Sequence, residues 1–407
     1  MLNVFGQTFK DNGYQLMNDR DAPIWQNPGY WPATFRITPN WHRESVNRAA
    51  IDAIPGDPTS GTVQSNLVAN GFDTTGLDFH TGGTLAKNIS FYVLPSSDAT
   101  GAFHFETVMG RLDNLLGSSW LNLKMGKFEL DNIISEKRIL TISNNGGIYQ
   151  IYHFVPVGDS NTWGQMGDNQ FGAELMGHSQ NDRTRYSIAV LSSNDGQVML
   201  PNRNAYSAFL TASQAFNMGY DGGVARVGAY FFTGDAPTFN LTAGGAPILG
   251  VGNKGFHREG LFGLLYVKKL DFQLFYQHGW DSAFFGTGTP SNGTLPAGAR
   301  SPTWNGGFVE THYVVHPQLI LIQRSEFIRM SNQALPLCST GATPCVASSS
   351  LGNIDAYTFG YRWYPIMSSR AGFAWHNEYS LVRRQGVSPT LTSLTNSSVM
   401  AGFDIDF

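Results

Sequence analysis

Apolar and polar residues alternate along most of the chain from about residue 74 onward, in runs separated by turn-rich segments. The clearest run extends from Ile354 to Tyr364, where aromatic residues share one face and small or polar residues share the other. The next run, after a short turn at 365–369, repeats the pattern. A period of two is typical of a β-strand with two unlike faces. The two aromatic faces contain Tyr357, Phe359, Tyr361 and Trp363, then Phe373, Trp375, Tyr379 and Leu381.

The segments between these predicted strands alternate between short and long. Transmembrane barrels have this arrangement, with tight turns at one end and longer loops at the other. We predict an all-β fold, a transmembrane antiparallel β-barrel of about 16 strands (16–18). Its first strand is expected at Trp31–Trp41, residues 42–72 have loop composition, and residues 1–30 could form a further strand or a periplasmic segment. The next strands are expected near 73–80, 84–95, 101–113, 118–130, 168–178, 183–193 and 203–216.

Composition supports a barrel and excludes several other classes. Only 14% of the 407 residues are charged, against roughly a quarter in soluble domains. The longest apolar stretch, Gly260–Val267, is far shorter than the ~20 residues of a transmembrane helix, which excludes a helical membrane protein. A net charge of −4 argues against a nucleic-acid partner, which favours a basic surface. Large barrels form single domains, so residues 1–407 are expected to form one.

One connection, at about 131–167, is unusually long and apolar. It contains the runs Ile133–Leu140 and Ile148–Tyr152, which would be unfavourable in water. We therefore expect a lumenal constriction loop that folds into the barrel and narrows it. The alternative is an ordinary hairpin of two strands between residues 139 and 155.

The C-terminal residues carry a membrane-protein signature. Five apolar residues alternate with polar or small ones up to the last position, and Asp404 and Asp406 lie on the opposite face. This pattern resembles the C-terminal strand motif of outer-membrane proteins. The resemblance implies an outer-membrane location in a Gram-negative bacterium, contact with its lipid, and recognition by the barrel-assembly machinery. Because residues 1–5 lack a basic and apolar leader, we expect that a signal peptide has been removed. The apolar face comprises Val399, Ala401, Phe403, Ile405 and Phe407.

A second resemblance covers about residues 84–140. Trp120–Glu129, which includes Gly126-Lys127-Phe128, followed by Glu136-Lys137-Arg138, resembles the phosphate-selective porin family, in which a Gly-x-Phe strand end leads into the constriction loop. The Pro-Phe that usually follows is replaced by Leu130-Asp131. Gly82–Phe91 is also similar to the porin component of porin–cytochrome electron conduits. The chain has no Cys-x-x-Cys-His haem motif, so such a role requires a partner multihaem cytochrome.

These observations leave a channel for small polar or ionic solutes as the first hypothesis and a barrel that sheathes a multihaem cytochrome as the alternative. No catalytic, metal or cofactor motif stands in a supporting context, and an enzyme at the rim is the third hypothesis. Charges of both signs on lumen-facing positions and in the loop predict weak charge selectivity. Cys338 and Cys345 lie in a Ser/Thr-rich loop and are expected to form a disulfide; the alternative is two free thiols. The expected lumen and constriction residues are Lys124, Glu136, Lys137, Arg138, Arg185, Arg226, Arg362 and Glu378.

Overall fold

The computed structural model describes most of the chain as one all-β assembly. Its described residues contain one short 3-10 helix, η1 (Leu115–Gly117), besides strands and turns. No helix among them is long and apolar enough to cross a membrane. The described residues are 23–26, 31–97, 101–136, 140–155, 164–192, 206–219, 223–237, 240–241, 247–248, 253–283, 300–332, 353–368, 371–385 and 394–406.

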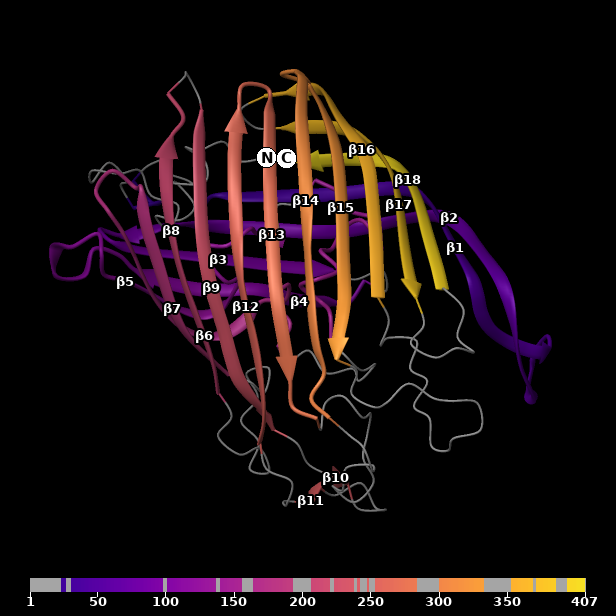
Figure 1. The fold of residues 1–407 in the computed structure, drawn as a ribbon. Helices are drawn as coiled ribbons and strands as arrows, with labels where there is room; N and C mark the ends of the chain where they lie inside the picture. The colour runs from indigo at the N-terminus through magenta and orange to yellow at the C-terminus, as the bar shows by residue number, and fades with distance from the viewer. Residues whose placement is uncertain are drawn as a thin grey trace.

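Sixteen strands form one closed antiparallel barrel (Figure 1), which confirms the predicted fold class. Each strand pairs with its neighbours in sequence, and β1 pairs with β18 to close the sheet, with Trp41 opposite Ala401. The short strands β10 (Asn240–Leu241) and β11 (Pro247–Ile248) form a separate pair. The barrel strands are β1 (Ala33–Ile54), β2 (Asp57–Ala86), β3 (Ile89–Ser97), β4 (Phe103–Leu112), β5 (Asn122–Phe128), β6 (Gln170–His178), β7 (Thr184–Ser192), β8 (Tyr206–Asn217), β9 (Val224–Pro237), β12 (Asn253–Val267), β13 (Leu270–Asp281), β14 (Thr303–His316), β15 (Leu319–Asn332), β16 (Asn353–Met367), β17 (Gly372–Gln385) and β18 (Leu394–Asp406).

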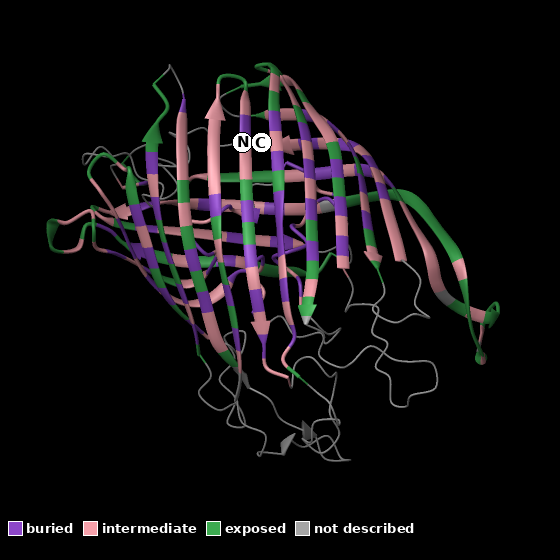
Figure 2. Cartoon of the chain, viewed as in Figure 1, coloured by how far each residue is buried: buried purple, intermediate pink, exposed green. Residues whose placement is uncertain are grey.

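The two faces of the sheet differ as the alternation predicts. On β16, Phe359 is 50% exposed while the adjacent Thr358 is 2% exposed. On β17, Tyr379 is 43% exposed and His376 is fully buried. Buried and exposed bands therefore follow one another along the strands (Figure 2). The outward side carries aromatic and aliphatic side chains, and the inward side of these strands carries the polar ones.

The prediction that residues 42–72 form a loop is wrong. They belong to β1 and β2, which are much longer than expected and pair from Ala33 opposite Thr81 to Ile54 opposite Asp57. β18 accompanies β1 only as far as Val46, and the rest of the hairpin is a two-stranded ribbon that extends away from the barrel at the right of Figure 1. Much of the ribbon is exposed on both faces. It needs no apolar face, so hydrophobic alternation could not reveal it.

Connections are short at one end of the barrel and long at the other. At the upper end in Figure 1, β12 and β13 are joined by Lys268-Lys269 alone, and β14 and β15 by Pro317-Gln318. At the opposite end, about 40 residues separate β5 from β6. This asymmetry agrees with the predicted arrangement of turns and loops.

A hydrophobic cluster occupies the interior along β5, β7–β9 and β12–β17. It is unusual because many other inward positions of this barrel are polar or charged. Residues of the long loop complete it, since Tyr149, Ile151 and Tyr152 are almost fully buried within it. Inward-facing aromatic residues of the wall form the rest: Phe209, Tyr230, Phe232, Phe256, Phe262, Phe275, Trp304 and Phe308.

Candidate functional site

The connection between β5 and β6 crosses the barrel interior, and we call its residues 129–169 the inner loop. Its described parts make hydrogen bonds with inward-facing residues of β13 to β18, on the far side of the barrel from β5. No described residue between 140 and 155 forms a strand. The long inward-folded loop of the predicted fold is confirmed, and the hairpin alternative is wrong.

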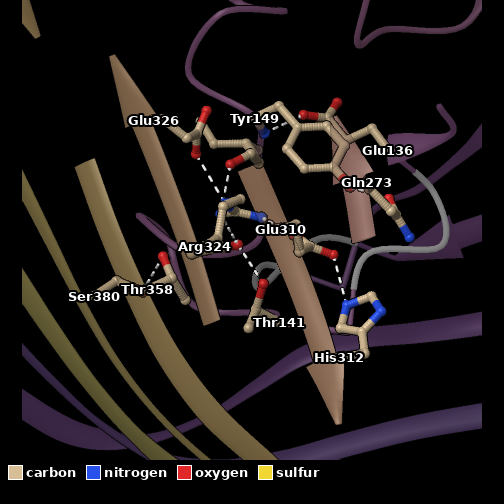
Figure 3. A network of polar contacts seen from close by, with 12 residues as sticks. Glu136, Thr141, Tyr149, Gln273, Glu310, His312, Arg324, Glu326, Thr358 and Ser380 are labelled. Atoms are coloured by element: carbon tan, nitrogen blue, oxygen red, sulfur yellow. Dashed lines mark hydrogen bonds and ion pairs between the residues drawn. The ribbon is translucent and has the colours of Figure 1, made fainter. Parts of the chain in front are cut away.

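Arg324 of β15 fixes the middle of the inner loop (Figure 3). The Arg324 guanidinium donates hydrogen bonds to the backbone carbonyl oxygens of Gly146, at 2.5 Å, and Ile148, at 2.9 Å. The same guanidinium pairs with Glu310 at 3.1 Å and with Glu326 at 2.8 Å. All three side chains are buried. A buried cation therefore has two carboxylates to balance its charge and two loop carbonyls to use its remaining donors.

The carboxylates of this group have further partners. Glu326 accepts a hydrogen bond from the backbone N–H of Gln150 at 2.7 Å. Glu310 contacts His312 Nε2 at 2.8 Å, and His312 Nδ1 contacts Asp271 at 2.7 Å. Together these residues form a buried polar row across β13, β14 and β15. Because each carboxylate has a hydrogen-bonding or cationic neighbour, the row is a rigid anchor.

A second anchor lies on β16 to β18. Glu378 accepts hydrogen bonds from the backbone N–H groups of Ile142, at 2.8 Å, and Ser143, at 2.6 Å. Its other neighbour is His376 Nε2, at 2.9 Å. Arg362 donates from Nε to the carbonyl oxygen of Leu140 at 2.7 Å and pairs with Asp404 at 3.2 Å. The wall thus binds the loop backbone at both ends of residues 140–150.

Aromatic contacts hold the same part of the loop. The Tyr149 ring stacks on Phe308 with centroids 4.1 Å apart, and its hydroxyl donates to Gln273 at 3.2 Å. Tyr152 meets Phe275 edge to face at 4.9 Å and donates to the carbonyl of Ile134 at 2.8 Å. Burial raises the pKa of both tyrosines well above the ordinary value, so both hydroxyls remain protonated donors.

The first residues of the inner loop are tied to the nearer wall. Lys124 of β5 pairs with Asp131 of the loop and with Glu174 of β6, both at 2.6 Å. On β8, Ser213 donates to the Asn132 side chain at 2.6 Å and accepts from Arg226 at 3.0 Å. The inner loop is therefore bound to both sides of the barrel wall. These contacts restrict its movement within the lumen.

The structure places most of the predicted lumen residues on inward positions, in different settings. Lys124, Arg362 and Glu378 contact the inner loop directly, as described above. Arg185 pairs with Asp182 in the turn after β6. Glu136 stays within the loop, where it accepts from the backbone N–H of Tyr149 at 2.6 Å and contacts His153 at 2.7 Å. The predicted residues outside the described part of the chain are Lys137, Arg138, Phe407, Cys338 and Cys345.

The sequence prediction missed the strongest anchors. Arg324, Glu326 and Glu310 lie on the polar face of their strands, which alternation could have shown, but Leu319–Ile322 is apolar on both faces and hides the alternation of β15. Arg258 faces inward, is fully buried and pairs with Asp281 at 3.0 Å. Its guanidinium lies 4.4 Å from the Trp304 ring. No group of three or more potential metal ligands occurs among the described residues.

The C-terminal strand presents its predicted apolar face outward. Phe403 meets Trp375 edge to face at 4.5 Å and lies 5.1 Å from the Phe373 ring on the outside of β17. Ile405 pairs in register with Phe373, while Asp404 points inward to Arg362. Phe403 and Ile405 are thus available to lipid and to proteins that bind this face.

Comparison with known proteins places the fold. No protein-family model and no curated protein matches the sequence. The anion-selective porin from Comamonas acidovorans has a similar structure, with a TM-score of 0.52 and 9% identity over 93% of this chain and 100% of that chain. OprB of Pseudomonas putida gives a TM-score of 0.52 and 9% identity over 99% and 96%. A loop L8 deletion mutant of OmpT, an outer membrane protein of Vibrio cholerae, gives 0.50 and 11% over 92% and 99%.

The chain has the fold of an outer-membrane porin. At these identities the likeness concerns the fold alone. The resemblances to the phosphate-selective porin family and to porin–cytochrome conduits stay predictions.

Proposed function

We propose that the protein is a porin-like channel that lets small polar or ionic solutes diffuse across the outer membrane of a Gram-negative bacterium, without chemistry. The observation that carries this proposal is the inner loop, which Arg324 and Glu378 hold across the barrel interior. The inner wall carries many polar and charged side chains beside the hydrophobic cluster. A barrel of sixteen strands is wide enough to enclose a water-filled channel unless something fills it. Because the inner loop is fixed to the wall, it narrows the channel permanently and does not act as a gate.

We infer weak selectivity between anions and cations, because lumenal charges of both signs are paired. Lys124 is balanced by Asp131 and Glu174, and Arg362 is balanced by Asp404. A charge in such a pair contributes little net field to a passing ion. The neighbouring anion-selective porin from Comamonas acidovorans makes anions the first solutes to test.

The membrane partners follow from the outward face. Aromatic and aliphatic side chains contact outer-membrane lipid, and the alternating face that ends in Phe403, Ile405 and Phe407 would be bound by the barrel-assembly machinery during insertion. Deleting Phe407 should reduce insertion in cells while the purified chain still refolds into detergent. Normal insertion without Phe407 would contradict this role.

The alternative, a sheath around a multihaem c-type cytochrome, has less support. The inner loop and the apolar cluster around Tyr149 and Phe308 occupy part of the space that a cytochrome would need. Copurification of a haem-absorbing subunit in mild detergent would favour the sheath, and purification of the chain alone would count against it.

Planar-bilayer recording of the purified full chain tests the channel directly. We expect discrete conductance steps whose reversal potential in a salt gradient lies near zero, as weak selectivity requires. Absence of any discrete step, from protein shown by circular dichroism to be folded, would overturn the proposal. Addition of empty micelles of the same detergent to the bilayer serves as the control.

A further inference from the structure

The outward face of the barrel carries an apolar groove on its β9–β16 side. The groove has a volume of about 920 Å³ and is lined across β9, β12, β13, β14, β15 and β16. Small residues such as Gly263 and Ser325 lie between bulky ones and make the surface concave. Five spacings of about 4.8 Å between six strands give a width of about 24 Å. We call this surface the outer groove, and one row of cross-strand partners along it reads Val227, Gly263, Leu274, Val309, Ser325 and Tyr357.

The sheet becomes polar directly beyond the outer groove, on the side of the long connections. In register there, Glu259 is opposite His278, His278 is opposite Asn305, and Asn305 is opposite Arg329. Asn305 accepts hydrogen bonds from the Tyr276 hydroxyl at 2.8 Å and contacts His278 at 3.0 Å. An apolar band followed by a polar band is the profile of the boundary between acyl chains and headgroups.

Two arginines flank the groove at this boundary. Arg329 of β15 forms an ion pair with Asp355 of β16, which itself lines the groove. Arg383 of β17 is the cross-strand partner of Asp355 on its other side and is exposed. Its side chain makes no hydrogen bond or ion pair within the described part of the chain. The three side chains carry a net charge of +1. Glu259 is three strands from Arg329 and does not neutralise this cluster.

We propose that the outer groove binds a phosphorylated lipid with several acyl chains, whose phosphate is held by Arg329 and Arg383. Guanidinium groups bind phosphate through paired hydrogen bonds. A width of six strands accommodates several acyl chains side by side, whereas a single chain would leave most of the groove unfilled. The inference rests on the membrane location given under Proposed function, but it does not depend on conduction.

Native mass spectrometry of the full chain in detergent tests the proposal, with diphosphorylated lipid A as the probe and the same lipid without phosphates as the comparison. Replacing both arginines, R329Q with R383Q, should weaken lipid A binding by about tenfold or more, as expected for lost charge-assisted hydrogen bonds. The matched control is K127Q with R43Q. Both control residues lie on outward positions away from the groove. Lys127 of β5 lies near the ring of Phe171 on β6, and Arg43 of β1 is exposed.

A third variant, Gly263→Phe, fills the groove without disturbing the sheet. A Cβ atom at Gly263 would meet only ordinary contacts, the nearest being Leu274 at 3.7 Å. This variant should reduce binding of both the phosphorylated and the dephosphorylated lipid. The proposal is wrong if all variants bind lipid A like the wild type, or if K127Q with R43Q loses as much lipid A affinity as R329Q with R383Q. It is also wrong if G263F instead abolishes self-association, because the groove would then bind a second copy of the chain. Absence of conductance with lipid A binding intact would contradict the proposed channel and would leave the lipid proposal unaffected.

Discussion

Arg324 on β15 donates a hydrogen bond of 2.5 Å to the carbonyl oxygen of Gly146, a residue 178 positions earlier in the chain. The contact joins the middle of the inner loop to the wall opposite the strand from which the loop departs. It depends on the ion pairs that hold the guanidinium in place, because an unpaired buried cation would be strongly unfavourable. Arg324 therefore couples the position of the loop to the barrel wall, together with Glu378 and Arg362.

Replacing Arg324 with Met should destabilise the fold and free the loop. Removing Arg324 leaves Glu326 without a cationic partner and Glu310 with His312 alone, and breaking a buried charge group costs about 3–5 kcal/mol. We expect a lower free energy of unfolding in urea titrations in detergent, together with larger and noisier single-channel conductance. The control is Arg329→Met on the outward face of the same strand, where an exposed ion pair contributes about 1 kcal/mol or less. Equal losses for the two variants would show that Arg324 does not anchor the loop.

Glu378 and Glu326 should protect different parts of the loop backbone. Glu378→Ala removes the acceptor for the N–H groups of Ile142 and Ser143, while Glu326→Ala removes the acceptor for Gln150. Loss of each acceptor costs about 1–3 kcal/mol locally, so amide exchange should accelerate by about tenfold or more at those amides. Hydrogen–deuterium exchange with peptide resolution measures both. Identical exchange patterns in the two variants would contradict separate anchors.

The Tyr149 ring should contribute more than its hydroxyl. Tyr149→Phe loses only the 3.2 Å hydrogen bond to Gln273, worth about 1 kcal/mol, and should leave conductance nearly unchanged. Tyr149→Ala also loses the stacking on Phe308 and opens a cavity, at about 3–5 kcal/mol. Urea unfolding of the two variants gives the comparison. A larger effect from Phe than from Ala would indicate that the hydroxyl has a role outside this packing.

The β1–β2 ribbon should be dispensable for the barrel. Beyond Asn47, which accepts a hydrogen bond from the backbone N–H of Thr395, β1 does not pair with β18. In this ribbon Ile54 is 60% exposed and Val63 is 47% exposed. Replacing residues 50–64 with an Asn-Gly turn between Ala49 and Ser65, which are cross-strand partners, should change the unfolding free energy by about 1 kcal/mol or less, since little buried area is lost. Thermal and urea unfolding test this, and a large loss would show that the ribbon supports the barrel.

A strand could be predicted from the sequence only where one of its faces meets lipid. Tyr357, Phe359 and Trp363 showed β16 clearly, because one side of a lipid-facing strand must be apolar at every second position. The same rule failed in the β1–β2 ribbon beyond Asn47, where much of both faces is exposed. It also failed to identify Arg324, because Leu319–Ile322 of the same strand is apolar on both faces. Composition indicated that residues 131–167 would be buried, but it did not indicate against which wall.

The all-β architecture, the lipid-facing side of most strands and the unusual character of the long loop can all be derived from the sequence. Those properties follow from local rules, namely a period of two and the cost of exposing apolar side chains to water. Only the tertiary structure decided which charges meet. Arg324 and Gly146, or Glu378 and Ile142, become neighbours through closure of the barrel and the path of the loop. Contacts between residues so far apart depend on strand order and register together, which no local pattern encodes.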